Sequence, residues 1–306
     1  MIGDLYRKML WNEIKSNELL IKVLDVGAAG DSAPLWKHGL NSTKFITVDP
    51  FAPEGSVDIP YGLGAHETSA TLYQTSNPFC SSLFQPNVNY LEKKYNNMHI
   101  DQRKVSSKNE IKIVPGDNYI DSLMNLDFIK IDTQGSEHSI LLGLKETIER
   151  YKPIMYLETW LEEVYENAPN THQIINELKE MNYEIIYTEV GASWVVNKTN
   201  PIKKGRRQSV GMDILAMHKD TFKNLSIENS KLMLSKVAIL ELYGMHSHVE
   251  KYLNALISIG CNISTRYRNK YLKRLRIIPN NWLANILDYF CGNRFAHKRI
   301  YPKLYD

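Results

Sequence analysis

Residues 22–30 read KVLDVGAAG, a short apolar run that ends in a turn with two glycines. The apolar run is typical of a buried parallel strand, and Gly27 and Gly30 allow a tight turn and the close approach of a ligand to the main chain. Asp25 stands near the end of the strand, so the stretch suits a ligand with an amino group and ribose hydroxyls, such as S-adenosylmethionine. An ordinary strand-to-helix turn with a solvated carboxylate stays open as the alternative.

A second predicted strand, residues 44–49, ends in Asp49, which lies 22 positions after Gly27. An acid at this distance binds ribose hydroxyls in βαβ nucleotide-binding units, whether the cofactor is NAD or S-adenosylmethionine. The turn has Ala33 in place of the third glycine of the dinucleotide fingerprint, which that fingerprint allows, but it has Asp25 in place of the first. This departure favours S-adenosylmethionine over NAD.

The composition is that of an ordinary globular protein of 306 residues, with 43% hydrophobic and 23% charged residues. A net charge of +3 implies no general polyanion partner. Three scattered cysteines predict reduced thiols in a cytosolic protein, with neither a disulfide framework nor a zinc site. No apolar run approaches the ~20 residues of a membrane span, and residues 1–20 are typical of an amphipathic helix rather than a signal peptide.

Residues 127–137 read DFIKIDTQGSE, a second strand-turn-helix pattern. We expect a buried strand that ends at Asp132, at the carboxyl edge where open α/β sheets bind ligands. We expect Ser136 to cap a helix over residues 137–150 whose apolar side faces the sheet. The next predicted strand ends in another acid, Glu158.

The rest of the chain up to residue 218 alternates between predicted strands and helices, which favours one parallel-rich sheet covered on both sides. The other expected strands cover residues 57–63, 70–75, 110–114, 153–158, 183–188, 193–196 and 212–217. The other expected helices cover residues 3–16, 32–40, 88–96, 117–126 and 171–181.

A polar loop, residues 77–83, has the sequence NPFCSSL. The hydroxyl groups of Ser81 and Ser82 are suited to binding a ligand. They are equally typical of a solvated connection with hydrogen bonds from side chain to backbone. Both interpretations stay open from the residues alone.

The composition changes after residue 219. Residues 232–259 have a strongly helical pattern, and residues 261–306 hold ten Lys or Arg against two acids, with aromatic residues between them. This basic segment suits an anionic membrane, a glycolipid or a nucleic acid, or it is a helical appendage with a charged outer face. We therefore predict a main domain over residues 1–218 and a basic, aromatic-rich helical region over residues 219–306.

The two strand-turn patterns together resemble the FkbM-type family of S-adenosylmethionine-dependent methyltransferases, over roughly residues 20–218. Residues 128–137 look like the strand-turn-helix signature of that family, and residues 24–30 look like its first cofactor motif. Residues 81–83 are similar to its central Ser-Ser-Leu loop. The region after residue 219 matches nothing in the family core.

The resemblance implies a Rossmann-like class I methyltransferase, an α/β fold with a mostly parallel sheet and helices on both faces. The C-terminal helical appendage after it is predicted from the helical pattern and composition alone. It implies O-methylation of a sugar, glycan or related secondary metabolite in surface polysaccharide biosynthesis. The implied roles at the cofactor are the methionine end for Asp25, Gly27, Ala28 and Gly30, the ribose for Asp49 and the adenine for Gly64. We also predict Ser81, Ser82 and His138 as substrate-binding residues.

O-methylation requires alignment of an oxygen with the methyl group and removal of the hydroxyl proton. Alignment supplies ~7–11 kcal/mol in favourable models, and a general base adds ~10²–10⁴-fold. We predict Asp132 as the base, with Glu137 and Glu158 in the same acidic cluster and with His138 and His66 as fallback bases. Three carboxylates near a hydroxyl also suit Mg²⁺, which would acidify it directly. In the alternative interpretation, Lys130 and Glu137 are structural partners and Glu158 holds a loop.

Two other function classes stay open, a nucleic-acid methyltransferase that uses the basic segment and a non-catalytic scaffold for glycan assembly. The absence of an Asn-Pro-Pro-Tyr-like motif at Asp132 argues against base methylation, and the intact Asp25 and Asp49 argue against lost cofactor binding. A dehydrogenase is disfavoured because nothing resembles a hydride-transfer site. The expected partner is a sugar or glycan, and residues 261–306 suit peripheral contact with a membrane or glycolipid. The expected location is the cytoplasm, or the inner face of the membrane; nucleic acid is not expected, and the oligomeric state stays open.

Overall fold

The structure is a computed structural model, and it describes most of the chain up to Ile263. The described residues are 14–15, 17–28, 36, 40–52, 55–95, 97–196, 207–261 and 263. The helices expected over residues 3–16 and 32–40 therefore lie almost entirely outside the described residues. The basic segment, of which only Cys261 and Ile263 are described, lies almost entirely outside them too, as does Gly30.

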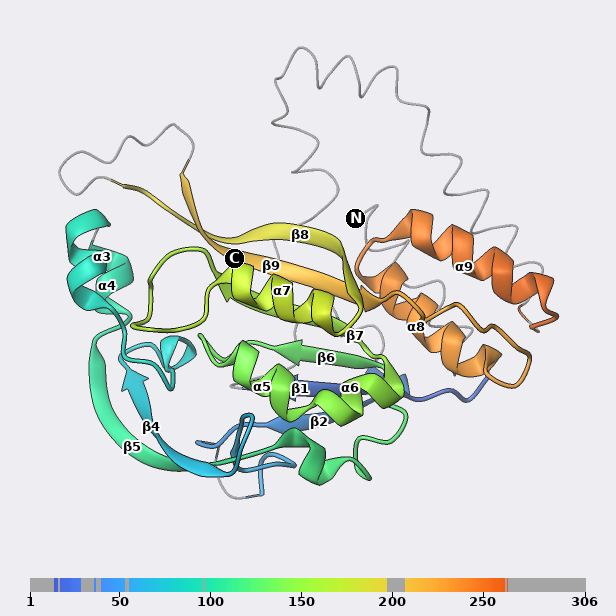
Figure 1. The fold of residues 1–306 in the computed structure, drawn as a ribbon, viewed down its shortest axis with the longest axis horizontal. Helices are drawn as coiled ribbons and strands as arrows, with labels where there is room; N and C mark the ends of the chain where they lie inside the picture. Colours follow the sequence, from blue (N-terminus) through green and yellow to red (C-terminus); the bar gives the residue numbers. More distant parts are fainter. Residues whose placement is uncertain are drawn as a thin grey trace, which may run out of the picture. The chain divides into compact units, whose positions relative to one another are not determined.

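A six-stranded sheet forms the centre of the larger part of the molecule, with the strand order β2-β1-β6-β7-β9-β8 (Figure 1). Its strands are β1 (Ile21–Val26), β2 (Thr43–Val48), β6 (Phe128–Ile131), β7 (Ile154–Trp160), β8 (Tyr183–Trp194) and β9 (Gln208–His218). β6 pairs in parallel with β1 and β7, whereas β9 runs antiparallel to β7 and β8. The expectation of an α/β fold with a mostly parallel central sheet is confirmed.

A second sheet of three strands, in the order β3-β5-β4, was not expected. β3 covers only Gly62–Leu63, so the predicted strand over residues 57–63 is too long, and Ile59 forms just an isolated bridge to Val48. β4 (Thr68–Thr75) and β5 (Val105–Val114) are longer than predicted. They pair with each other along almost their whole length. The residues beyond the predicted ranges are mostly polar and show no apolar alternation, so only the pairing with the neighbouring strand makes them part of the sheet.

The helix predicted over residues 137–150 is two helices, α5 (Glu137–Gly143) and α6 (Lys145–Tyr151). The carboxylate of Asp117 accepts hydrogen bonds from the backbone N–H groups of Glu146 and Thr147, at 2.9 Å each, and so caps α6 from a distant segment. The prediction of a helix over residues 117–126 is also wrong. Its first turn is a 3₁₀ helix, Gly116–Tyr119, that places Asp117 at α6, and turns follow it.

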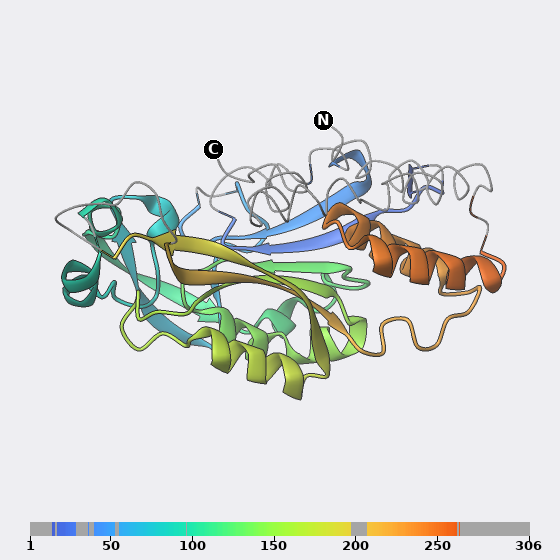
Figure 2. The same ribbon diagram turned by 90° about the horizontal axis from the view of Figure 1, so that it is seen from above.

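The other helices of this part are α3 (Val88–Lys94), α4 (Asn97–Asp101) and α7 (Thr171–Glu180). α5 and α7 pack against β7, on one face of the sheet (Figure 2). The strand predicted in two pieces over residues 183–196 is the single strand β8, which is kinked by register shifts against β9.

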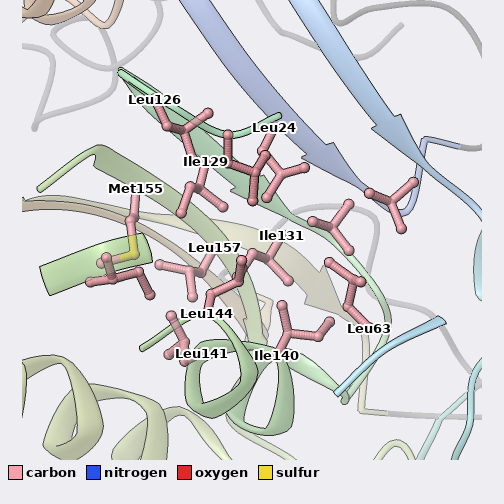
Figure 3. Close-up of a cluster of buried hydrophobic side chains, with 14 of the residues drawn as sticks. Leu24, Leu63, Leu126, Ile129, Ile131, Ile140, Leu141, Leu144, Met155 and Leu157 are labelled. Carbon is pink, nitrogen blue, oxygen red and sulfur yellow. The ribbon is translucent and has the colours of Figure 1, made fainter. Parts of the chain in front are cut away.

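The main core lies between the sheet and α5, where buried aliphatic side chains meet from both layers (Figure 3). Burying each of these side chains fully is worth about 1.5–3 kcal/mol relative to leaving it in water. The labelled residues in the figure are Leu24, Leu63, Leu126, Ile129, Ile131, Ile140, Leu141, Leu144, Met155 and Leu157.

The chain divides into two compact units, one of residues 22–31 and 45–221 and one of residues 1–21, 32–44 and 222–306. The described part of the second unit contains α8 (Ser230–Leu242) and α9 (His246–Ser258), so the helical pattern over residues 232–259 is confirmed as two helices. None of the helices within the described residues is long and apolar enough to cross a membrane. The functional boundary at residue 218 stays a prediction.

Candidate functional site

The turn after β1 brings the ends of three strands together. Gly27 has φ +85°, and a Cβ atom there would lie 2.0 Å from the carbonyl oxygen of Asp132, so only glycine fits. The backbone N–H groups of Gly27 and Ala28 donate to the carbonyl of Val48, and the N–H of Asp132 donates to the carbonyl of Val26. The predicted cofactor turn and the predicted base are therefore in direct contact through the main chain.

Lys130 joins the two acids that the sequence singled out at this edge. Its Nζ lies 3.2 Å from Oδ1 of Asp25 and 3.6 Å from Oδ2 of Asp132. The parallel register of β1 and β6 places Lys130 opposite Asp25, and the aspartate side chain is largely buried. Lys130 thus supplies a positive charge between two carboxylates that would otherwise repel each other.

Gln134 connects Asp132 to Glu158. Its Nε2 donates to Oδ1 of Asp132 at 3.1 Å and to Oε1 of Glu158 at 3.4 Å. The Gln134 backbone has φ +59°, a conformation that is uncommon for any residue except glycine and that often marks functional sites. The hydroxyl of Tyr165 lies 3.0 Å from the remaining polar atom of this amide, Oε1. Asp25, Asp132 and Glu158 therefore belong to one polar network, which we call the acid network and which includes Lys130 and Gln134.

The pKa of the Glu158 carboxyl group is raised well above its ordinary value. Burial raises its pKa most, and the negative charges of Asp132 and Asp213 raise it further. Asp213 lies opposite Glu158 in the pairing of β7 with β9. Burial also raises the pKa of Asp213, to about 6, although the Tyr156 hydroxyl donates to its Oδ2 at 2.7 Å and acts in the opposite direction. Asp213 was not predicted as a site residue. It could have been recognised as an acid inside the otherwise apolar strand predicted over residues 212–217.

Glu137 organises the turn between β6 and α5. Its Oε1 accepts from the N–H of Thr133 at 3.1 Å, from the hydroxyl of Thr133 at 3.0 Å and from the N–H of Gly135 at 3.1 Å. Burial raises the Glu137 pKa, and these hydrogen bonds lower it. The expected cap by Ser136 is wrong, because its side chain makes no capping hydrogen bond and the Glu137 carboxylate satisfies the turn instead.

Ser82 ties the polar loop to the acid network. Its hydroxyl donates to the carbonyl of Gln134 at 2.7 Å and accepts from the N–H of Phe84 at 2.9 Å, and the residue is almost fully buried. The hydroxyl of Ser81 accepts from the N–H of Thr75 at 3.2 Å. Both hydroxyls thus make the backbone contacts of a structural loop, and Ser82 holds the Gln134 backbone in place.

The remaining predicted residues form contacts of their own. His138 Nε2 lies 3.1 Å from Oε2 of Glu177, a contact that joins α5 to α7. Gly64 is in close contact with α5, since a Cβ at Gly143 would lie 2.0 Å from the Gly64 carbonyl oxygen. Asp49 follows β2 and accepts the N–H of Phe51 at its Oδ1, at 2.8 Å.

No cluster of three or more His, Cys, Asp or Glu side chains in the described part of the chain has the arrangement of a metal site. The acids of the network are instead bonded to Lys130 and Gln134. The expected Mg²⁺ site is therefore not supported by the described residues.

Comparison with protein families identifies the chain. The model of the FkbM methyltransferase domain matches residues 25–185, more than half of the 306 residues. The chain belongs to the FkbM methyltransferase family. The resemblance read from the sequence is thereby confirmed, and the matched region runs from the end of β1 into β8, so it contains Asp25, Asp132 and Glu158.

Among solved structures, the chain is similar to the crystal structure of methyltransferase FkbM from Methylobacillus flagellatus KT. The sequence identity is 17% and the TM-score is 0.36, over 64% of this chain and 43% of that chain. The aligned part thus spans less than half of the solved chain. A search among curated proteins found no match.

Proposed function

We propose that the protein is an S-adenosylmethionine-dependent O-methyltransferase that acts on a hydroxyl of a sugar, a glycan or a related secondary metabolite, in surface polysaccharide biosynthesis. Methyltransferases of this family generally use S-adenosylmethionine. The observation that carries the proposal is the link between the turn after β1 and a buried acid pair, Asp132 and Glu158, through Lys130 and Gln134.

The residues at the strand ends fit the cofactor. Asp25 ends β1, and Gly27 lacks a side chain where the main chains of two strands meet. Asp49 follows β2 with Oδ1 bonded to its own turn, and within the described residues its other oxygen has no hydrogen-bond partner and suits ribose hydroxyls. When bound, S-adenosylmethionine supplies a methyl group on a positively charged sulfur. The strand order, with one antiparallel strand inserted next to the edge, also suits a Rossmann-like class I methyltransferase.

The acid pair fits the chemistry of the acceptor. A sugar hydroxyl must lose its proton as its oxygen takes the methyl group, and a positioned carboxylate accelerates such a step ~10²–10⁴-fold. The Asp132 carboxylate would accept this proton. Glu158, whose pKa is raised, shares the Gln134 amide with Asp132 and would keep the pair singly charged.

Calorimetric titration tests the cofactor. We expect S-adenosylmethionine and S-adenosylhomocysteine to bind with micromolar affinity and NAD not to bind. We expect Asp49→Ala to weaken both sulfur ligands at least about tenfold, because it removes hydrogen bonds from ribose to a charged acceptor. Asp101→Ala is the matched control, since Asp101 is exposed and pairs only with Lys104 in the described structure.

A well-folded sample that binds neither sulfur ligand would overturn the proposal and favour a non-catalytic scaffold. Equal loss of affinity in Asp49→Ala and Asp101→Ala would remove Asp49 from the cofactor site. If binding is confirmed, a screen of sugar acceptors follows, with the Asp132→Asn variant as the test of the base.

A further inference from the structure

The guanidinium of Arg103 is buried in a cluster of aromatic side chains. Only 4% of the residue is exposed, and its Cζ lies over the rings of Trp194 at 4.9 Å, Trp160 at 5.3 Å and Tyr165 at 5.8 Å. These rings come from β8, β7 and the segment after β7, and Arg103 itself immediately precedes β5. We call this group the arginine cluster. Attraction to the rings offsets part of the cost of burying a charge that cannot be neutralised.

No carboxylate of the described residues forms an ion pair with Arg103. Its Nη1 donates to the carbonyl of His99 at 3.3 Å, whereas its buried Nε has no hydrogen-bond partner among the described residues. A buried guanidinium with an unused N–H is costly unless an acceptor completes it. The Nε side of the guanidinium is the edge that binds a carboxylate or phosphate with two parallel hydrogen bonds.

Two further polar groups of the cluster have no partner within the described residues. They are the indole Nε1 of Trp160 and the hydroxyl of Tyr95, both buried, neither with a partner within hydrogen-bond distance in that part of the chain, although the positive charge of Lys94 lies close to the Tyr95 hydroxyl. The Tyr95 ring packs edge-on against Trp194 at 5.0 Å between centroids, and Trp194 is 6.0 Å from Trp160. Because the indole and the guanidinium only donate, and the hydroxyl donates as well as accepts, the set as a whole favours an acceptor group with negative charge.

His99 adds no competing charge. Its ring stacks on Trp194 with 4.4 Å between centroids. Burial lowers the His99 pKa to about 4, and the positive charges of Arg103 and Arg207 lower it further. The ring is therefore neutral at physiological pH, and Arg103 is the cation at the centre of the cluster.

The arginine cluster adjoins the acid network. Trp160 follows Glu158 by two positions on β7, so both side chains leave the same face of the strand. The Tyr165 hydroxyl lies 3.0 Å from Oε1 of Gln134, which bonds both acids. Burial raises the pKa of the Cys80 thiol most, Arg103 lowers it, and Glu158 and Asp132 raise it, so the thiol is within electrostatic reach of both groups.

We propose that Arg103, together with Trp160 and Tyr95, binds an anionic group of the methyl acceptor, a carboxylate or a phosphate, and so places its hydroxyl at Asp132. This inference rests on the proposed function for the role of the site, and it gives the acceptor class: an acidic or phosphorylated sugar rather than a neutral one. A neutral sugar would leave the buried guanidinium without an acceptor. The protein would therefore discriminate against neutral sugars, because the cost of the unpaired, buried N–H group of Arg103 would remain.

Small anions test the proposal on the full-length protein. We expect acetate and inorganic phosphate, at constant ionic strength, to shift the indole N–H signal of Trp160 in ¹⁵N NMR spectra, because that N–H gains an acceptor. The signal is assigned with Trp160→Phe. Acetamide, which has the shape of acetate without its charge, should leave the signal in place.

Arg103→Gln should weaken the acetate or phosphate response about tenfold or more, because the charge-assisted hydrogen bonds are lost. Arg103→Lys keeps the charge but cannot form two parallel hydrogen bonds to one anion, so it should bind acetate or phosphate less tightly than the wild type. It serves as the test variant if Arg103→Gln fails to fold. Arg150→Gln is the matched control, since Arg150 is exposed on α6 and lies over Tyr151. A larger response to acetate identifies a carboxylate source, and a larger response to phosphate identifies a phosphorylated one.

Equal shifts with acetate and acetamide, or a full response in Arg103→Gln, would overturn the proposal. Titration of the same samples with S-adenosylhomocysteine separates it from the proposed function. If the anions do not bind but the cofactor does, only the proposed role of the arginine cluster is rejected. If the anions bind but the cofactor does not, the proposed methyltransferase activity is rejected.

Discussion

At the scale of single residues, the charge of Asp132 acts on the buried carboxyl group of Glu158. The Asp132 charge is one of the causes that raise the Glu158 pKa, so its removal should lower that pKa. We expect Asp132→Asn to shift the Glu158 titration toward its ordinary range without abolishing the shift, because burial is the larger cause. The measurement is ¹³C NMR of the glutamate carboxyl groups as a function of pH.

Asp121→Asn is the matched control, because Asp121 is exposed and lies in the turns before β6. A Glu158 titration that is unchanged in Asp132→Asn would mean that the two carboxylates do not interact. The base would then be Asp132 alone, and the Gln134 bridge would have no electrostatic role.

Asp213 should make stability depend on pH. Its pKa is raised to about 6 in the folded state, so the folded protein binds a proton more tightly than the unfolded chain. That contribution is fully present below the ordinary aspartate pKa and is lost as the pH rises through about 6. We expect the unfolding free energy of the wild type to fall relative to that of Asp213→Asn between pH 4 and 7, by up to about 3 kcal/mol. Urea unfolding across this range measures it.

The sequence identified Asp25, Asp132 and Glu158 because an acid at the end of an apolar run is visible in one dimension. It could not show that Lys130 lies between two of these acids, since that contact depends on the register of β1 against β6. Arg103 escaped for a similar reason. Its burial is produced by three aromatic side chains that are far away in the chain.

At the scale of elements, the turn between β6 and α5 depends on Glu137 rather than on Ser136. We expect Glu137→Ala to lower the unfolding free energy by about 2–4 kcal/mol, because three donors lose their acceptor. Ser136→Ala is the matched control. The buried Ser136 hydroxyl has no partner among the described residues, so its removal should change stability by no more than about 0.5 kcal/mol. Chemical denaturation of both variants measures the difference.

A large loss of stability in Ser136→Ala with little change in Glu137→Ala would restore the serine cap that the sequence suggested. If Glu137 also served catalysis, Glu137→Gln would keep the fold through its remaining acceptor oxygen yet lose turnover. This variant therefore separates the structural role from a chemical one.

Most strands of the central sheet were predictable because buried parallel strands form short apolar runs between turn residues. The break between α5 and α6 was not, because the apolar spacing continues across Leu144 while the cap comes from Asp117 in another segment. Periodicity records which side of a helix is buried, but it contains no information about a cap contributed from elsewhere.

At the scale of the whole molecule, the expectation of one sheet followed by an appendage was too simple. A second sheet, β3-β5-β4, is formed by strands that lie between β2 and β6 in the sequence. Its two long strands, β4 and β5, are polar along much of their length. The compact unit that contains α8 and α9 also includes residues 32–44, which run from after β1 to the start of β2 in sequence. Linear composition cannot reveal such an interleaved arrangement, since it sees only neighbours along the chain.

The arginine cluster has a consequence for the order of folding. It joins Tyr95 and Arg103 to Trp160 and Trp194, so it closes only after segments about 100 residues apart have met, and such long-range contacts carry the entropy cost of a large loop. Refolding should therefore complete the helices well before these rings surround the guanidinium. We therefore expect the arginine cluster, to which we assign the anionic group of the acceptor, to be among the last parts of the protein to form.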